Sequence, residues 1–221
     1  FKKYLFLTEA MNVVNERKRP YIVMEGMSDR FMATYKRPFE AKDIKVVMYA
    51  GGLHERYGLK KLTEAFMMLP QENFRLKLFG SGPFVEKLKT KYTKKDSRIQ
   101  YMGVAPNAEV VAAELDASLL VNPRPTHEEF TKYSFPSKNI EYMASGTPLL
   151  TTKLPGMPKE YYPYVFLIEN ESVEGYAKAL ESVLAQSDEE LYVFGEKAKD
   201  FVLEKKNSFE QAKRVIELIK L

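Results

Sequence analysis

Short apolar segments alternate with helix-like segments along most of the chain, and this alternation restricts the possible folds more than any other feature. The sequence predicts strands over Lys45–Gly51, Phe74–Gly80, Arg98–Gly103, Ser118–Pro123, Thr147–Thr152 and Tyr164–Glu169. Between them, apolar residues recur at the spacing of a helix face, as in Leu59–Leu69. Strands separated by helices are typical of a parallel sheet with helices on both faces. We therefore expect an α/β fold with a Rossmann-like parallel sheet.

The two ends of the chain follow other patterns. From Ser172 onward the spacing is wholly helical, which predicts a helical tail with N-caps at Ser172, Ser187 and Ser208. Before the alternation begins, the sequence predicts one helix over Lys3–Glu16 and one strand over Tyr21–Met24. We therefore divide the chain into a leader, residues 1–43, and an α/β domain, residues 44–221.

Composition excludes several classes of site. The chain of 221 residues has no cysteine, which rules out disulfides and thiolate ligands and is typical of a reducing cytoplasm. With two histidines, a histidine-rich metal site is excluded as well. The net charge of +4 suits anionic ligands such as phosphates, but the lysines are dispersed and no nucleic-acid-binding motif is present. No apolar run approaches the roughly 20 residues of a membrane span.

In a parallel α/β sheet, ligands bind where strands end and loops enter helices. The first strand ends at Gly51 and Gly52, which allow a close approach of the backbone to a ligand, although a plain tight turn remains an alternative. The third strand ends at Gly103 and Val104, where backbone groups suit a flat base but do not demand one. The turn at Gly51 and Gly52 matches neither a dinucleotide fingerprint nor a Walker loop.

The loop after the strand Ser118–Pro123 is long, polar and aromatic, which favours a functional role. It ends where a helix begins at Ser137, and the N–H groups of such a helix start attract phosphate. Lys138 adds positive charge there, and Glu141 lies three residues on, on the same helix face. A diphosphate at the helix start with Glu141 on a ribose is one interpretation. An ordinary surface ion pair is the other.

These motifs occur together in one known family. The quoted segments are "YAGGLHERYGLKKLTEAF", "LFGSGPFVEKLK", "IQYMGV", "NPRPTHEEFTKYSFPSKNIEYMASGTPLLTT" and "LPGMPKEYYPYVFLI". Their order resembles the C-terminal, nucleotide-sugar-binding half of retaining family 4 (group 1) glycosyltransferases of GT-B fold. The stretch "YSFPSK…EYMASGTP" is similar to the subgroup that makes bacterial surface polysaccharides. The leader resembles the end of the N-terminal domain and the interdomain linker of that family.

The resemblance implies roles for particular residues. In this family the donor's diphosphate lies against the glycine pair of the first turn and the helix start, here Ser137 and Lys138. The last glutamate of the E-x7-E motif, here Glu141, holds the ribose, and the base contacts the turn at Gly103 and Val104. Transfer proceeds with retention and usually without a bound metal, so no cofactor is expected beyond the UDP- or GDP-sugar substrate.

The chain departs from the family pattern in two places. The first glutamate of the motif falls at Tyr133, and the usual arginine and lysine of the first turn fall at Gly52 and Tyr57. Arg56 and Lys138 are the nearest substitutes for the missing phosphate cations. Candidates to meet the sugar or its developing charge are Glu128, Glu129, Thr131 and Lys132. Of these, Glu128 and Glu129 join Lys138 as the predicted catalytic residues, while Lys132 and Tyr133 join the predicted donor site.

The resemblance therefore predicts a donor-binding glycosyltransferase domain whose partners are a nucleotide sugar, a saccharide or lipid-linked acceptor, and an N-terminal domain outside this chain. A cytoplasmic location is expected, peripheral at the inner membrane face in the full-length protein. Self-association through the strand Tyr21–Met24 is an open alternative. Two other functions remain: a nucleotide-sugar epimerase on the same scaffold, and a non-enzymatic flavodoxin-like interaction module.

Overall fold

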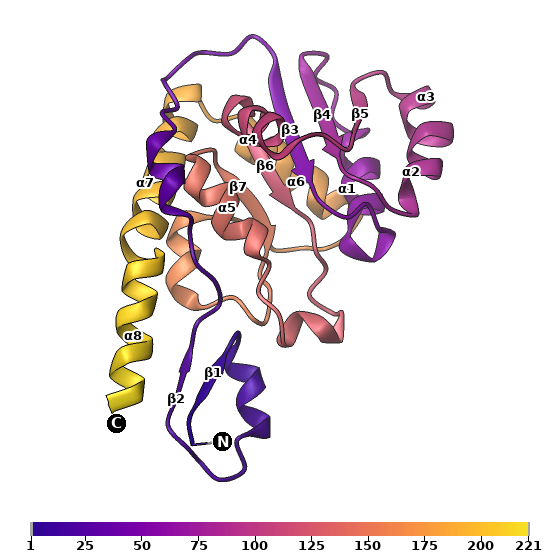
Figure 1. Cartoon of the computed structure of the whole chain (residues 1–221). Coiled ribbons are helices and arrows are strands. Elements are labelled where there is room, and N and C mark those ends of the chain that lie inside the picture. Colours follow the sequence, from indigo (N-terminus) through magenta and orange to yellow (C-terminus); the bar gives the residue numbers. More distant parts are fainter. Residues whose placement is uncertain (1, 221) are drawn as a thin grey trace.

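The computed structural model describes residues 2–220, and within them the main sheet contains six parallel strands (Figure 1). They are β3 (Lys45–Ala50), β4 (Phe74–Phe79), β5 (Ile99–Gly103), β6 (Leu119–Asn122), β7 (Leu149–Thr152) and β8 (Phe166–Ile168). They lie in the order β5-β4-β3-β6-β7-β8, and every neighbouring pair runs parallel. The predicted Rossmann-like sheet is therefore confirmed.

The strand order places a topological switch point at the centre of the sheet. β3 lies between β4 and β6, so the chain first builds the sheet on one side of β3 and then on the other. In open parallel sheets, ligands bind beyond the carboxyl ends of the strands at such a point. Here it lies between Gly51, which follows β3, and Pro123, which follows β6.

Helices cover both faces of the sheet, as the alternation predicted (Figure 1). They are α1 (Leu59–Phe66), α2 (Phe84–Lys87), α3 (Thr93–Lys95), α4 (Asn107–Asp116), α5 (Ser137–Ser145), α6 (Val173–Leu184), α7 (Asp188–Lys205) and α8 (Ser208–Lys220). One apolar core joins the sheet to α1, α2 and α6, and a second joins it to α4, α5 and α7. Within residues 2–220, no helix combines the length and apolar character needed to cross a membrane.

The helical tail begins at side-chain caps. Ser172 accepts the N–H of the third residue of its helix, and Ser187 exchanges hydrogen bonds with Glu190 in a capping box, so both predicted N-caps are confirmed. The third prediction is wrong by one residue. Asn207, not Ser208, accepts two N–H groups of the first turn of α8, at 2.9 and 3.0 Å. An asparagine carbonyl caps as well as a serine hydroxyl, and here it precedes the serine.

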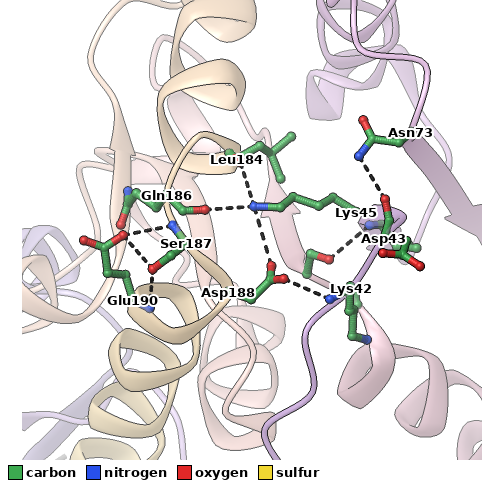
Figure 2. A network of polar contacts seen from close by, with 12 residues as sticks. Lys42, Asp43, Lys45, Asn73, Leu184, Gln186, Ser187, Asp188 and Glu190 are labelled. Atoms are coloured by element: carbon green, nitrogen blue, oxygen red, sulfur yellow. Dashed lines mark hydrogen bonds and ion pairs between the residues drawn. The ribbon is translucent and has the colours of Figure 1, made fainter.

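A polar network at the amino end of β3 fixes the last part of the leader, residues 36–43, against the sheet (Figure 2). This part of the leader is called the linker below. The Lys45 ammonium donates to the carbonyls of Leu184 and Gln186, both at 2.8 Å, at the end of α6. It also lies 3.5 Å from Asp188 at the start of α7, and Asp188 accepts the N–H of Lys42 at 2.9 Å. Lys45 thus caps the carboxyl end of α6, where positive charge is favourable, and joins it to α7 and the linker.

The leader differs from the sequence prediction at its start. Tyr4–Phe6 form the strand β1 and Glu9–Val14 form a 3-10 helix, so the predicted helix over Lys3–Glu16 is wrong. β1 pairs in parallel with β2 (Tyr21–Val23), which confirms the other predicted element. Pairing with a distant segment overrides the local helical spacing, because side-chain burial in a strand pair depends on its partner. Self-association through this strand stays a prediction.

Buried polar contacts attach the leader to the helical tail. The Lys206 ammonium lies 2.6 Å from Glu25, and their side chains are 5% and 2% exposed. The Tyr161 hydroxyl donates to the same carboxylate at 2.5 Å, and burial followed by the Glu25 charge raises the pKa of Tyr161. Arg214 on α8 donates to the carbonyl of Val23 at the end of β2, at 2.7 Å, and Figure 1 shows α8 running beside this strand. The division at residues 43 and 44 stays a prediction.

Candidate functional site

A pocket of about 250 Å³ lies at the switch point, between the ends of β3 and β6 and the start of α5. This switch-point pocket is lined by Tyr49, Ala50, Gly51, Gly52, Tyr57, Asn122, Arg124, Phe135, Pro136, Ser137, Lys138 and Tyr142. A lateral pocket of about 200 Å³ adjoins it, and Ala50, Gly51 and Lys138 line both. The structure therefore brings together four predicted site residues: Gly51, Gly52, Ser137 and Lys138.

The turns after β3 and β4 pack backbone against backbone, and this packing requires glycine at Gly80. Gly80, after β4, has φ +124°, and a Cβ on it would lie 1.9 Å from the carbonyl oxygen of Gly51. The Tyr49 hydroxyl donates to the carbonyl of Gly52 at 3.1 Å, and this hydrogen bond stabilises the turn after β3. Burial raises the pKa of Tyr49 to about 12, so this hydroxyl stays protonated at neutral pH. The turn is thus close-packed and exposes backbone rather than side chain to the pocket.

Buried side chains hold the start of α5 over the sheet. The N–H of Ala50 donates to the Tyr142 hydroxyl at 2.8 Å, and that hydroxyl donates to the carbonyl of Ala50 at 3.1 Å. The Asn122 amide donates to Asn139 at 2.5 Å, which ties the end of β6 to the same helix. Within residues 2–220, no side chain caps α5 before Ser137. The N–H of Asn139 donates to the carbonyl of Pro136 at 2.9 Å, so the N–H groups of Ser137 and Lys138 are the ones that remain available to an anion.

Lys138 lies between two carboxylates. Its ammonium is 2.8 Å from Glu141 on the same helix and 3.7 Å from Glu114 on α4. The side chains of Lys138 and Glu141 are 35% and 30% exposed, whereas that of Glu114 is fully buried. Burial and then the charge of Glu141 raise the pKa of Glu114 to about 7, against the opposing effect of Lys138. The ion pair expected as the alternative for Lys138 and Glu141 is present, with a buried third member.

Arg124 reaches the wall of the switch-point pocket from the loop after β6. Its guanidinium carbon lies 4.7 Å from the ring centre of Tyr57 and 5.5 Å from that of Phe130. Its Nε is buried without a hydrogen-bond partner in the described part of the chain. Arg56 also stacks on Phe130, but its side chain is 55% exposed and pairs with Glu128 at 3.4 Å. The aromatic faces therefore orient Arg124, whose donors remain for a ligand.

The lateral pocket borders the turn predicted to meet the base. Val104 lines this pocket and is 75% exposed, and Gly103 before it, with φ +76°, has open space around its Cα. Seven of the predicted site residues lie outside the linings of both pockets: Arg56, Gly103, Glu128, Glu129, Lys132, Tyr133 and Glu141. Glu129 and Lys132 are exposed in a 3-10 helix, and Tyr133 ends it. Their roles stay predictions.

A pocket of about 200 Å³ under the linker lies at the opposite end of the strands. Two of the three cations that line it, Arg37 and Lys42, are already engaged within the protein. Arg37 donates to the carbonyls of Leu115, Ala117 and Gly146 at 3.1 to 3.4 Å, and Lys42 lies 2.7 Å from Asp116. These contacts attach the linker to the sheet, and they leave the switch-point pocket as the better candidate site.

Sequence reasoning missed part of the site. Asn122 is the last residue of β6, beside β3, and Arg124 follows shortly after it, so the rule that parallel strand ends share one edge would have included both. The sequence predicts a functional loop here but no role for Arg124, because the orientation of this side chain depends on Tyr57, far away in the sequence. Glu114 had no signal at all, since a glutamate within an amphipathic helix normally indicates an exposed face.

The fold and the site define a class of protein. A parallel α/β sheet with a glycine turn, an uncapped helix start and the cations Arg124 and Lys138 at its switch point is suited to ligands that contain phosphate groups. The sequence comparison makes the class specific: residues 33–220 match the family of glycosyl transferases group 1, and the chain belongs to that family.

Individual proteins resemble this chain in sequence or in fold. The putative colanic acid biosynthesis glycosyltransferase WcaL of Escherichia coli is 30% identical over 112 residues, which cover 48% of this chain and 27% of the relative. The sucrose-phosphate synthase of Thermosynechococcus elongatus has a similar structure, with a TM-score of 0.75 and 18% identity. TarM of S. aureus, in a complex with fondaparinux, α-GlcNAc-glycerol and UDP, has a TM-score of 0.77 and 16% identity.

The matched relatives are longer than this chain. The two structural alignments cover 99% and 100% of this chain but 57% and 44% of those proteins. At these identities the structural likeness shows a shared fold. The family assignment supports sugar transfer as the general activity, whereas donor, acceptor and stereochemistry require separate arguments.

Proposed function

We propose that this chain is the donor-binding half of a GT-B glycosyltransferase of the retaining family 4. It transfers a hexose from a nucleoside-diphosphate sugar to a saccharide or lipid-linked acceptor, in the synthesis of a surface polysaccharide. The family match and the WcaL relative support this proposal, as does the resemblance of the "YSFPSK" stretch to polysaccharide-forming enzymes.

The switch-point pocket is the observation on which the proposal chiefly rests. It joins the Gly51-Gly52 backbone, the start of α5 at Ser137 and the cations Arg124 and Lys138 around one space. Each of these groups favours negative charge, and a diphosphate would contact all of them at once. The lateral pocket would then take the rest of the nucleotide, with the base at Gly103 and Val104.

The same groups explain how the pocket would assist transfer. When the bond between the anomeric carbon and the β-phosphate oxygen breaks, negative charge accumulates on the departing diphosphate. Arg124 and the N–H groups of α5 are already in place, and Lys138 lines the same pocket, so together they would stabilise that charge more in the transition state than in the ground state. The arginine's planar fork suits two phosphate oxygens, and the lysine acts as a point charge.

Several parts of the proposal concern the longer protein. The acceptor and an N-terminal domain would complete the cleft, so the chain as given should bind donor but transfer sugar slowly. Metal-free transfer with retention, the predicted roles of Glu128 and Glu129, and a cytoplasmic location at the inner membrane face remain predictions from the resemblance.

An epimerase would need an acid–base group beside the sugar, and the geometry gives this function less support. His127, the main candidate by residue type, has a side chain that is 68% exposed and lies 3.8 Å from Glu171, and it lines neither pocket. A flavodoxin-like interaction module would not need the uncapped helix start and Arg124 in one pocket.

Isothermal titration calorimetry tests the proposal directly. UDP, GDP, UDP-glucose and GDP-mannose are titrated into the protein, with UMP and GMP as controls that lack the β-phosphate. We expect one base series to bind, and its diphosphate to bind at least about tenfold more tightly than its monophosphate, because the pocket is built around the diphosphate. If none of these nucleotides binds at millimolar concentration, the proposed function is wrong.

A further inference from the structure

Glu114 is a buried carboxylate that the proposed binding steps do not use. It lies in the last turn of α4, and its side chain is fully buried. Both of its carboxylate oxygens are buried without a hydrogen-bond partner among residues 2–220. An ionised carboxylate in such a place is costly unless a cation is paired with it. The cation nearest to it in the described structure is the ammonium of Lys138, at 3.7 Å.

Apart from Lys138, the groups around the Glu114 carboxylate are apolar, acidic or neutral, and the Thr147 hydroxyl donates to the backbone carbonyl of Glu114 at 2.7 Å rather than to its carboxylate. From α5, the groups that act on it are Lys138, Glu141 and the buried hydroxyl of Tyr142. β3, the other element packed closely on α4, contributes Val46, Met48 and Ala50 to this side of the sheet. From the linker, Arg37 reaches α4 at backbone carbonyls, including that of Leu115. The Lys138 ammonium is therefore paired with two carboxylates at once: the partly exposed Glu141 on its own helix and the buried Glu114 on α4.

Lys138 lines both pockets, so it is also the group best placed to meet a donor's diphosphate. An ammonium that turns toward a phosphate weakens its contact with Glu141 and with Glu114. Glu141 is partly exposed and can be solvated by water or by a sugar hydroxyl. Glu114 is enclosed, so its charge cannot be solvated in the same way. Glu114 can lose this unpaired buried charge by taking up a proton from solvent as the Lys138 ammonium moves away.

The geometry points to Glu114 as a positioning residue that holds the Lys138 ammonium at the pocket wall in the free protein and releases it to the donor's diphosphate by taking up one proton. This inference rests on the proposed donor site and adds a regulated charge to it. The step forms one O–H bond on Glu114 and consumes one solvent proton. No covalent change of the donor is involved.

The inference predicts a pH dependence with a definite sign. In the free protein, burial followed by the charge of Glu141 raises the pKa of Glu114 to about 7. Loss of the ammonium and arrival of phosphate charge would raise that pKa further, so the bound state holds more protons than the free state. Above about pH 7, donor affinity should therefore fall with rising pH, by up to about tenfold per unit.

The test uses UDP-glucose, GDP-mannose and ADP-glucose as probes, because their phosphates are diesters that do not titrate near neutral pH. Calorimetry at about pH 8, repeated in buffers of different ionisation enthalpy, counts the protons taken up per ligand bound. The wild-type protein should take up between about half and one proton. Glu114→Gln keeps the shape of the side chain and should abolish this uptake. Glu109→Gln, at an exposed position of the same helix, should leave it unchanged.

The comparison of variants separates Glu114 from other titrating groups. His54 lies beside the turn at Gly52, and any effect of this side chain on binding should be the same in wild type and Glu114→Gln. Binding without proton uptake by the wild type, or equal uptake by Glu114→Gln, would overturn the inference and leave the donor site standing. If none of the three probes binds, the proposed function is wrong. The proposed contact of the Lys138 ammonium with a diphosphate is then wrong as well.

A titration without ligand checks the pairing itself. Carbon-13 NMR of the side-chain carboxyls follows Glu114 in the free protein, with Glu114→Gln to assign its signal. Its pKa should be about 7 in the wild type, and Lys138→Met should raise it because the one opposing charge is removed. An ordinary glutamate pKa in the wild type, or no change in Lys138→Met, would overturn the role of Glu114 whether or not a nucleotide binds.

Discussion

Arg124→Leu tests the prediction that Arg124, and not the neighbouring Arg56, is the arginine that binds the donor's diphosphate. Arg124 lines the switch-point pocket, and its Nε is buried without a partner in the described chain, so removal should not break an internal ion pair. What is removed is one or two charge-assisted hydrogen bonds to the diphosphate, together about 1.5 to 3 kcal/mol. Affinity for the diphosphate should therefore fall by about 10- to 150-fold.

Arg56→Leu is the matched control. Both arginines stack on Phe130, but Arg56 is 55% exposed, pairs with Glu128 and lies outside the pocket lining. An exposed ion pair contributes about 0 to 1 kcal/mol, so its loss should change affinity less than about fivefold. Arg124→Lys keeps the charge without the planar fork and should fall between the two variants.

The assay is calorimetry with the nucleoside diphosphate that binds best and with its monophosphate. If Arg124 contacts the β-phosphate, Arg124→Leu should reduce the preference for diphosphate over monophosphate, whereas Arg56→Leu should preserve it. Circular dichroism spectra of all variants establish that the fold is intact. Equal losses for the two leucine variants, or a larger loss for Arg56→Leu, would refute the assignment and favour Arg56 as the phosphate cation.

Three further predictions concern stability, each measured by urea or thermal unfolding. Lys45→Met removes the cap of α6 and should cost about 1 to 3 kcal/mol. Lys206→Met leaves the buried Glu25 carboxylate without its cation and should cost about 3 to 5 kcal/mol, whereas exposed Lys213→Met should cost under about 1. The pKa of Glu114 is raised from 4.5 to about 7 in the folded protein, so its stabilising contribution is complete below pH 4.5 and is lost as the pH rises to 7. The stability of Glu114→Gln relative to wild type should grow across that window toward about 3 kcal/mol, and a difference independent of pH would contradict the buried charge.

The sheet could be predicted from sequence because its signals are local. Each strand is a short apolar run that ends in a turn, and each intervening helix shows its own periodicity. The leader could not be predicted in the same way. Tyr4–Phe6 has no strand signal of its own and becomes a strand because Tyr21–Val23 lies beside it. Such pairing is a property of two segments together, and local spacing describes only one of them.

The candidate site likewise has a part that could be predicted from sequence and a part that could not. The resemblance implies that Gly51 and Ser137 contact one diphosphate, and the switch-point pocket contains both residues. The internal geometry of the site was beyond sequence reasoning. Whether Lys138 meets a carboxylate of its own helix or of α4 depends on how two helices pack on one face of the sheet. Burial of Glu114 is a consequence of that packing.

The charges around Lys138 explain why a proton is useful at this site. With both carboxylates ionised, Glu114 and Glu141 balance Arg124 and Lys138, so the cluster offers little net attraction to a ligand whose two phosphates are each negative. A proton on Glu114 leaves the same groups with a net positive charge, inside a site where burial of Glu114 limits screening by solvent. Negative charge increases further on the diphosphate as the sugar departs, so the protonated cluster stabilises the transition state more than the bound donor. A Glu114→Gln enzyme, which keeps the neutral form at every pH, should therefore retain high donor affinity in alkaline buffer while the wild type loses it.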